Sequence, residues 1–430
     1  MRRATAVTAL AVTSITSVAA FAWAQRMDPR RPATVVVGMP AGAAPMARVD
    51  PKRSAQSQSP LPAAPLKVAW RKPLSSAPNV GIEHAALVLA DGRVMVITTQ
   101  GEAVWLDGQS QTGDERARIP EKLGLTGPPV VLADGTFVVV ATNGEVVGFT
   151  SEGRKWRTPL GGERALGTRI APFPLPDGGV VVATSTELSV LDASGGMRAR
   201  ATLPEAIGGP LLAARGKVVA ISAIGGVVYT WTPGREVTRA GSLGGAVDGG
   251  AAIMGDHVIV AMVDPGTQSR VMTFDLDTGV AAPRATAPPN QAYLGPPAIV
   301  GDVVFGLGGA PARSYVIALD ASGAEKLHVP IPSPPLPPNS VAVDGGLVVY
   351  TPQPHVGVLV DRGGAIAFAS PEGMVGVVDS TGLLSTVTSA DSPCAKNGSK
   401  FAVAGLTPFG NGAFIVTCVN GNVLKIATGD

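Results

Sequence analysis

Charged residues and metal-binding residues are scarce in this chain. Only 15% of its 430 residues are charged, the net charge is +2, and no segment concentrates basic residues. A nucleic-acid-binding protein presents a concentrated basic face to the phosphate backbone, so we expect no nucleic-acid partner. A catalytic triad assembled from distant segments stays open, but no serine stands in a G-x-S-x-G turn. The four histidines have spacings that suit neither a metal site nor a catalytic pair: His84, His257, His328 and His355.

Cysteines and aromatic residues are also few. The two cysteines, Cys394 and Cys418, form neither an adjacent pair nor a C-x-x-C-H haem motif. In an exported chain we expect a structural disulfide between them, which would stabilise the fold by about 3 kcal/mol through chain entropy. Two separately buried thiols are the alternative. Aromatic residues make up 4% of the chain, so no exposed aromatic cluster predicts a binding hot spot.

The start of the chain predicts export. Two arginines precede an uncharged stretch from Ala4 to Ala24, which ends in the small-x-small pattern that signal peptidase requires. We therefore expect a signal peptide over residues 1–24 and a periplasmic or cell-envelope location, with an uncleaved N-terminal membrane anchor as the alternative. No cysteine lies near the cleavage site, so no lipid anchor is expected. Residues 25–65 are rich in proline and alanine without a periodic apolar face, which predicts a disordered tether.

The rest of the chain repeats a tight turn followed by a valine-rich strand. Examples are ADGRVMVITTQGEAVWLD from Ala90, ADGTFVVVATNGEVVGFT from Ala133 and PDGGVVVATSTELSVLD from Pro176. Eight such turns fall near residues 91, 134, 177, 215, 255, 301, 344 and 411. A period of about 40–45 residues with several short strands is typical of a β-propeller blade.

We predict an all-β propeller over residues 66–430, with eight four-stranded blades. Seven blades is the alternative, because the last interval between turns is 67 residues whereas the others are 38 to 46. Residues 362–400 are either an extra hairpin or part of a blade in which residues 340–352 are the insertion.

A repeated pentapeptide indicates how the ring closes. WRKPL occupies residues 70–74 and WRTPL residues 156–160. Trp156 lies where the outermost strand of the second repeat is expected, so its ring should pack between blades, and Trp70 has the same local context. The last repeat stops after three strands. Segment 66–74 is therefore predicted to supply the missing fourth strand and to close the ring.

Aspartates recur at the same turn of different repeats. Calcium requires roughly six or more oxygen ligands that converge on one point, whereas these aspartates are spread over the turns of different blades. Aspartate side chains commonly cap such turns through nearby backbone amides. We therefore predict turn caps and no metal site for Asp192, Asp275, Asp277, Asp320 and Asp379.

Four segments carry a family resemblance: LDASGG, ALDASGAE, VVDSTG and SEGRKWR. They resemble degraded copies of the Asp-x-x-x-Gly-x-x-x-Trp outer-strand motif of the PQQ-like (quinoprotein-like) β-propeller repeat family, over residues 66–430. The resemblance implies either a dehydrogenase that holds a quinone cofactor and calcium, or an exported non-enzymatic propeller such as the BamB-like outer-membrane assembly factors. The dehydrogenases are longer and stack their cofactor on an adjacent-cysteine disulfide. This chain has no such cysteine pair, so no cofactor is expected.

These features favour a non-enzymatic interaction scaffold of the cell envelope that assists outer-membrane protein assembly. Loops on one face would engage a protein partner, and the chain would act as a monomer within a complex. The alternative is a ligand-binding or hydrolytic propeller that uses its central funnel, where groups from distant blades converge. No catalytic, cofactor-binding or metal-binding residue is predicted.

Overall fold

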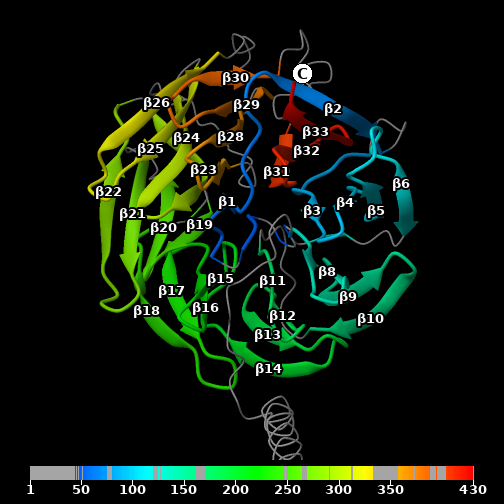
Figure 1. The fold of residues 1–430 in the computed structure, drawn as a ribbon. Coiled ribbons are helices and arrows are strands. Elements are labelled where there is room, and N and C mark those ends of the chain that lie inside the picture. Colours follow the sequence, from blue (N-terminus) through cyan, green and yellow to red (C-terminus); the bar gives the residue numbers. More distant parts are fainter. Residues whose placement is uncertain are drawn as a thin grey trace, which may run out of the picture.

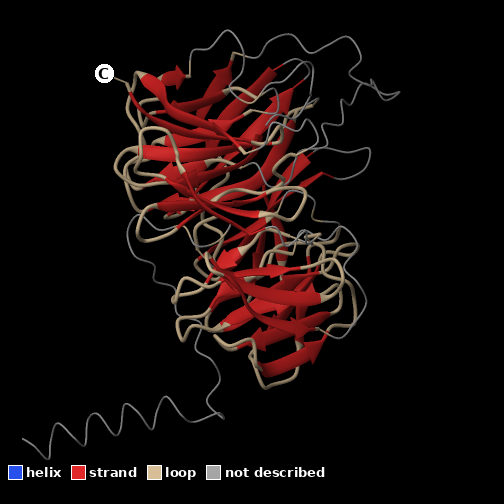
Figure 2. Cartoon of the chain, turned by 90° about the vertical axis from the view of Figure 1, so that its right-hand side faces the viewer, coloured by secondary structure: helices blue, strands red, loops and turns tan. Residues whose placement is uncertain are grey.

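The protein is a ring of β-sheets, shown along its axis in Figure 1 and from the side in Figure 2. The structure, a computed structural model, describes residues 44, 46, 48–50, 52–74, 80–119, 124–125, 127–160, 170–245, 247, 250–263, 269–289, 291–310, 313–332, 357–370, 373–387, 394 and 403–429. Among these residues no helix is long and apolar enough to cross a membrane. The predicted signal peptide over residues 1–24 lies outside the described residues.

Eight antiparallel sheets, the blades, surround the central axis, and the first strand of each is innermost (Figure 1). Blades 1 and 2 contain β3 (Leu87–Val88), β4 (Arg93–Ile97), β5 (Ala103–Asp107), β6 (Glu115–Ile119), β7 (Val130–Val131), β8 (Phe137–Val140), β9 (Glu145–Thr150) and β10 (Gly153–Pro159). Blades 3 and 4 contain β11 (Phe173–Pro174), β12 (Val180–Ala183), β13 (Glu187–Leu191), β14 (Met197–Thr202), β15 (Leu212–Ala214), β16 (Lys217–Ile221), β17 (Val227–Trp231) and β18 (Thr238–Ser242).

The second half of the ring has the same plan. Blades 5 and 6 contain β19 (Ala251–Met254), β20 (His257–Val263), β21 (Ser269–Asp275), β22 (Ala281–Thr286), β23 (Ala292–Val300), β24 (Val303–Ala310), β25 (Arg313–Leu319) and β26 (Glu325–Ile331). Blades 7 and 8 contain β27 (Leu359–Asp361), β28 (Ile366–Ala369), β29 (Val375–Val378), β30 (Leu384–Thr386), β31 (Val403–Pro408), β32 (Ala413–Cys418), β33 (Asn422–Thr428) and β2 (Leu66–Pro73). The prediction of eight blades is confirmed, and the seven-bladed alternative is wrong.

Blade 2 shows how the sequence determines strand position. Blades pack face to face around the ring, so both faces of an inner strand are covered. All four residues of β8, FVVV, are accordingly buried. The outer strand β10 instead alternates between exposed and partly buried residues. The turn between β7 and β8 uses Gly135 at φ 80°, a conformation that suits glycine because it has no Cβ.

The ring closes as predicted. Strand β2 pairs antiparallel with β33, from Leu66 opposite Thr428 to Pro73 opposite Asn422. Blade 8 therefore combines the start of the propeller with its end (Figure 1). This pairing covers what would otherwise be two unfinished sheet edges.

Blade 7 resolves the long interval near the C-terminus. Residues 359–386 supply its strands β27 to β30, so the part of segment 362–400 that the structure describes up to residue 387 belongs to a blade and is not an extra hairpin. Its first turn lies at Asp361, whose Oδ1 accepts a hydrogen bond from Ala365 N at 3.0 Å. The turn expected near residue 344 and the proposed insertion over 340–352 lie outside the described residues.

The two tryptophans of the pentapeptide occupy corresponding places between blades. Trp156 on β10 donates from Nε1 to the Ala193 carbonyl of blade 3 at 3.1 Å. A Cβ added to Gly195 would lie only 2.6 Å from the same ring. Trp70 on β2 meets blade 1 in the same way, with a Cβ on Gly113 falling 2.9 Å from its ring. Each indole thus fills the space above a glycine turn of the next blade.

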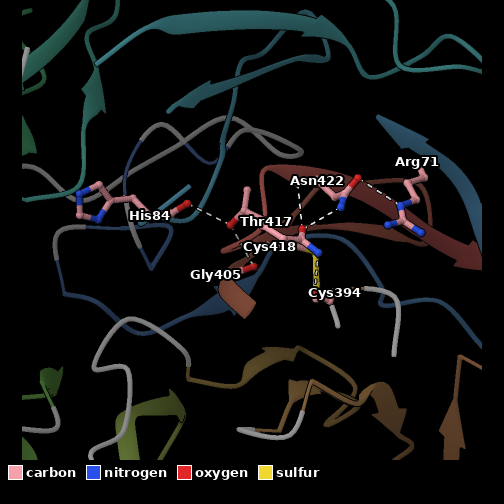
Figure 3. The surroundings of a disulfide bond; sticks show 8 residues. Arg71, His84, Cys394, Gly405, Thr417, Cys418 and Asn422 are labelled. Atoms are coloured by element: carbon pink, nitrogen blue, oxygen red, sulfur yellow. Dashed lines mark hydrogen bonds between the residues drawn. A yellow bond between two sulfur atoms is a disulfide. The ribbon is translucent and has the colours of Figure 1, made fainter. Parts of the chain in front are cut away.

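The expected disulfide is present in blade 8 (Figure 3). It joins Cys394 to Cys418 at the end of β32, with a Cα–Cα distance of 5.2 Å. Both cysteines are fully buried. Asn420 Nδ2 also donates to the Cys394 carbonyl at 2.7 Å, so this residue is held to the blade twice.

Candidate functional site in the central channel

The central channel of the ring is occupied by the protein's own chain, which we call the channel segment (residues 44–61). The prediction of a disordered tether over residues 25–65 is wrong for the part that the structure describes. The segment pairs with blade 1 at Val88 and with blade 2 at Val130 through Ala44 and Met46. Its strand β1 (Gln56–Ser57) pairs in parallel with β27 of blade 7, near the middle of the ring (Figure 1).

Carbonyl groups of the channel segment also accept hydrogen bonds from inner strands farther around the ring. The amides of Ile253 in blade 5, Ile299 in blade 6 and Val360 in blade 7 donate to consecutive parts of the segment. Their acceptors are the carbonyls of Lys52 at 2.8 Å, Ser54 at 2.8 Å and Ala55 at 3.0 Å. The main chain of the segment therefore satisfies backbone groups at the edges of the sheets that face the channel.

Arg53 anchors the channel segment to blades 3 and 4. Its side chain is 1% exposed. Its Nη2 donates to the carbonyls of Ala171 at 2.7 Å and Pro172 at 2.8 Å, and its Nε donates to Leu211 at 3.3 Å. These carbonyls belong to blades 3 and 4. The main-chain hydrogen bonds described above go to other blades, so Arg53 adds these two.

Arg48 anchors the segment on the opposite side of the channel. Its guanidinium donates to the carbonyl of Val358 at 3.4 Å and to that of Pro297. Burial lowers the pKa of Arg48 to about 9, partly opposed by Asp50. Burial likewise lowers the pKa of Arg53 to about 9, with Asp50 raising it and Arg48 lowering it. Both guanidinium groups thus remain charged at neutral pH.

A cavity of about 60 Å³ remains between the channel segment and the blades. All eight blades contribute to its wall, through His84, Pro128, Ala171, Pro210, Ala251, Pro296, Val358 and Leu406 in chain order. Pockets for organic ligands usually measure about 300–1,000 Å³. With the segment in place, the cavity has room for a few water molecules. The residues present therefore do not fit a fused-ring quinone cofactor at this position.

The recurring aspartates lie away from the channel, in the turns of four blades. Asp277 shares a turn with Asp275, and its Oδ2 accepts a hydrogen bond from Arg215 Nη2 at 2.8 Å. Asp192 Oδ1 accepts from the amides of Ser194 and Gly196, both at 2.8 Å. Asp320 and Asp379 accept from their own turn amides in the same way, and Asp275 Oδ1 accepts from the amide of Asp277 at 2.8 Å. Among the described residues, no three histidine, cysteine, aspartate or glutamate side chains gather as a metal site would require.

The histidines are separated as well. His84 lines the channel, and its carbonyl accepts from Thr417 Oγ1 of blade 8 at 2.9 Å (Figure 3). His257 lies in blade 5, with Nδ1 3.8 Å from Asp275 Oδ2. His328 lies in blade 6, where it stacks on Tyr315 with ring centroids 4.3 Å apart. His355 lies outside the described residues. The structure brings no two of the three described histidines into one site.

Sequence reasoning missed Arg48 and Arg53. Both lie in a proline- and alanine-rich stretch without apolar periodicity, which is the usual signature of a linker. The available signal was a small group of charged residues, ARVDPKR, which resembles the charged group RMDPRR earlier in the same region. This signal does not distinguish a solvated linker from a segment anchored by arginine.

Comparisons with known proteins agree with the geometry of the ring. Residues 61–232 match the family model described as outer membrane protein assembly factor BamB. No curated protein sequence matches the chain. BamB from Moraxella catarrhalis is 16% identical with a TM-score of 0.55, over 85% of this chain and 98% of that one. Quinohemoprotein alcohol dehydrogenase from Comamonas testosteroni is 11% identical with a TM-score of 0.59, over 90% of this chain and 81% of that one.

A europium-containing methanol dehydrogenase is also 11% identical with a TM-score of 0.59, over 94% of this chain and 99% of that one. At such low identities, these solved structures establish the fold and not the activity. Residues 61–232 are thus similar to the PQQ-like β-propeller repeat family, and the closed ring of eight blades shows the β-propeller fold.

Proposed function

We propose that the protein is a non-enzymatic interaction scaffold of the cell envelope that assists outer-membrane protein assembly. The observation that carries the proposal is the channel segment. It fills the position where a propeller would hold a ligand, and the cavity that remains has a volume of about 60 Å³. The match of residues 61–232 to the outer membrane protein assembly factor BamB supports the role, and the predicted signal peptide supports the location. The partner is expected to be a protein that contacts the loops of one face.

Exposed apolar side chains suggest which face to test. Met197, Val280 and Leu383 are 43%, 59% and 64% exposed. Each lies between the third and fourth strands of its blade, or at the start of the fourth, so all three lie at the same end of the ring. Ile224, 87% exposed, lies between the second and third strands of blade 4 and so belongs to the opposite end. Substitutions of the first three residues therefore test one end of the ring as the docking face, and a substitution of Ile224 at the opposite end is the matched control.

The proposal is tested by crosslinking the tagged, exported protein in cells and identifying what it retains. We expect recovery of an outer-membrane assembly protein. A triple variant, Met197→Asp, Val280→Asp and Leu383→Asp, should reduce that recovery by at least about 10-fold, which corresponds to roughly 1.4 kcal/mol of binding free energy. Ile224→Asp should leave it unchanged.

Recovery of monomer alone at high crosslinker concentration would contradict a scaffold role. In that case the alternative of ligand binding or hydrolysis in the central funnel would need direct screening with small ligands. Equal loss of partner in the triple variant and in Ile224→Asp would refute the assignment of the face, while leaving the scaffold role in place.

A further inference from the structure

The ring is complete without the channel segment. Every blade has four strands from the propeller itself, and β2 closes the ring by pairing with β33. The segment adds only the two-residue strand β1 to the inner edge of blade 7. No blade takes any of its four strands from the segment, so the segment lies in the channel as a ligand would, with Ala44, Met46 and Ala55 buried against the neighbouring blades.

The contacts of the channel segment are of the kinds by which proteins recognise peptides. Main-chain pairing to exposed strand edges provides attachment, and side chains in pockets provide specificity. The pairing involves blades 1, 2, 5, 6 and 7. Arg53 adds blades 3 and 4, while Arg48 adds a second contact to blades 6 and 7. The recognised feature is thus a stretch with two arginines five residues apart, which is turned between them by hydrogen bonds from Arg53 N to the Asp50 carbonyl and from Ala55 N to the Arg48 carbonyl.

The segment is held in a shape that it would not adopt alone. Four of its non-glycine residues have positive φ: Arg48 at 64°, Val49 at 74°, Arg53 at 58° and Ala55 at 53°. This region is unfavourable for residues with a Cβ, and most unfavourable for a β-branched residue such as Val49. Such a conformation persists only where surrounding contacts impose it. The shape is held by contacts with the channel together with hydrogen bonds within the segment, such as that from Arg53 N to the Asp50 carbonyl at 2.8 Å, and the strain opposes its retention.

We propose that the central channel is a binding site for a peptide that carries arginines five residues apart and folds into turns between them. The channel segment occupies this site in cis, and a separate peptide of the same sequence can replace it. The ligand class is a polypeptide with guanidinium groups that bond to inner-strand carbonyls. This inference does not depend on the proposed envelope function.

The test separates the channel segment from the ring without removing it. A protease recognition sequence is inserted after Pro62, between the segment and β2, and the purified full-length protein is cleaved. A fluorescently labelled synthetic peptide of residues 44–61 is then added, and its binding is followed by anisotropy and native mass spectrometry. We expect the labelled peptide to displace the cleaved N-terminal fragment while the far-UV circular dichroism of the ring is unchanged.

The matched control is the same peptide with Arg53→Ala. As an unlabelled competitor it should be at least 10-fold weaker than the unmodified peptide, because it cannot bond to blades 3 and 4. A second variant avoids cleavage: full-length Arg53→Met should bind the labelled peptide at a lower concentration than the unaltered protein does.

Three results would overturn the inference. First, the labelled peptide could bind neither to the cleaved protein nor to full-length Arg53→Met. The Arg53→Ala peptide could compete as well as the unmodified one, which would remove the role of the guanidinium. Finally, the ring could unfold when the fragment leaves, which would make the channel segment an integral part of the fold.

Discussion

Replacing Arg53 by methionine should release the channel segment locally and leave the ring folded. Methionine keeps an unbranched apolar side chain but removes the guanidinium, which donates to the carbonyls of Ala171, Pro172 and Leu211. A hydrogen bond to a charged group contributes about 1.5–3 kcal/mol net. The three bonds share one guanidinium, whose burial costs enough to lower its pKa to about 9. We therefore expect a loss of about 3 kcal/mol in total, which is less than the sum of three independent bonds.

Hydrogen exchange at three amides measures this loss directly. The amides of Ile253, Ile299 and Val360 donate to the segment, so their protection requires the segment to be in place. A loss of about 3 kcal/mol should speed their exchange by roughly 100-fold. The amide of Val147 in blade 2 lies within a β8–β9 pairing that the segment does not touch, so its exchange should not change.

The control variant is Arg116→Met. Arg116 pairs with Asp107, and its side chain is 57% exposed, so its removal should have little effect on stability. Unchanged exchange at Ile253, Ile299 and Val360 in Arg53→Met would refute the view that Arg53 anchors the segment. Equal acceleration in both arginine variants would do the same.

Three further predictions concern the ring itself. Trp156→Ala should lower the free energy of unfolding in urea by about 2–3 kcal/mol, because it empties the space between blades 2 and 3; a change below about 0.5 kcal/mol would show that the indole contributes little. Cys394→Ser should cost about 3 kcal/mol, and the unaltered protein under reducing conditions should match it; different stabilities for the two would implicate the substituted side chain rather than the lost crosslink. Burial raises the pKa of Asp192, but hydrogen bonds from Ser194 and Gly196 outweigh it, and the net pKa is lowered. Its carboxylate therefore stabilises the fold above the unfolded-state pKa of about 3.9, and this contribution is lost as pH falls through the lower folded-state pKa. Asp192→Asn should keep the turn and flatten the acid branch of the stability–pH curve, whereas Asp192→Ala should lose about 1 kcal/mol at pH 7; identical curves for the two variants would contradict this account.

The architecture was predictable because its interactions are local. Each blade is an antiparallel meander, so a strand pairs with the next one in the chain and the turns recur at a regular interval. The ring closure was also predictable, since the last repeat lacked one strand and the segment around Trp70 matched it. Blade 7 was ambiguous because the sequence has glycine-containing turn motifs near both residue 344 and Asp361, and the pattern alone does not say which begins the blade.

The sequence by itself determined that this chain forms an all-β propeller of eight blades, closes by pairing its two ends, and can form a disulfide between Cys394 and Cys418. Tertiary structure alone decided what fills the channel. The partners of Arg53 are 118 to 158 positions away in the chain, and those of Arg48 are 249 and 310 away. These partners are backbone carbonyls, which every residue possesses and which leave no mark on the sequence. Only the closed ring brings them within reach of two arginines.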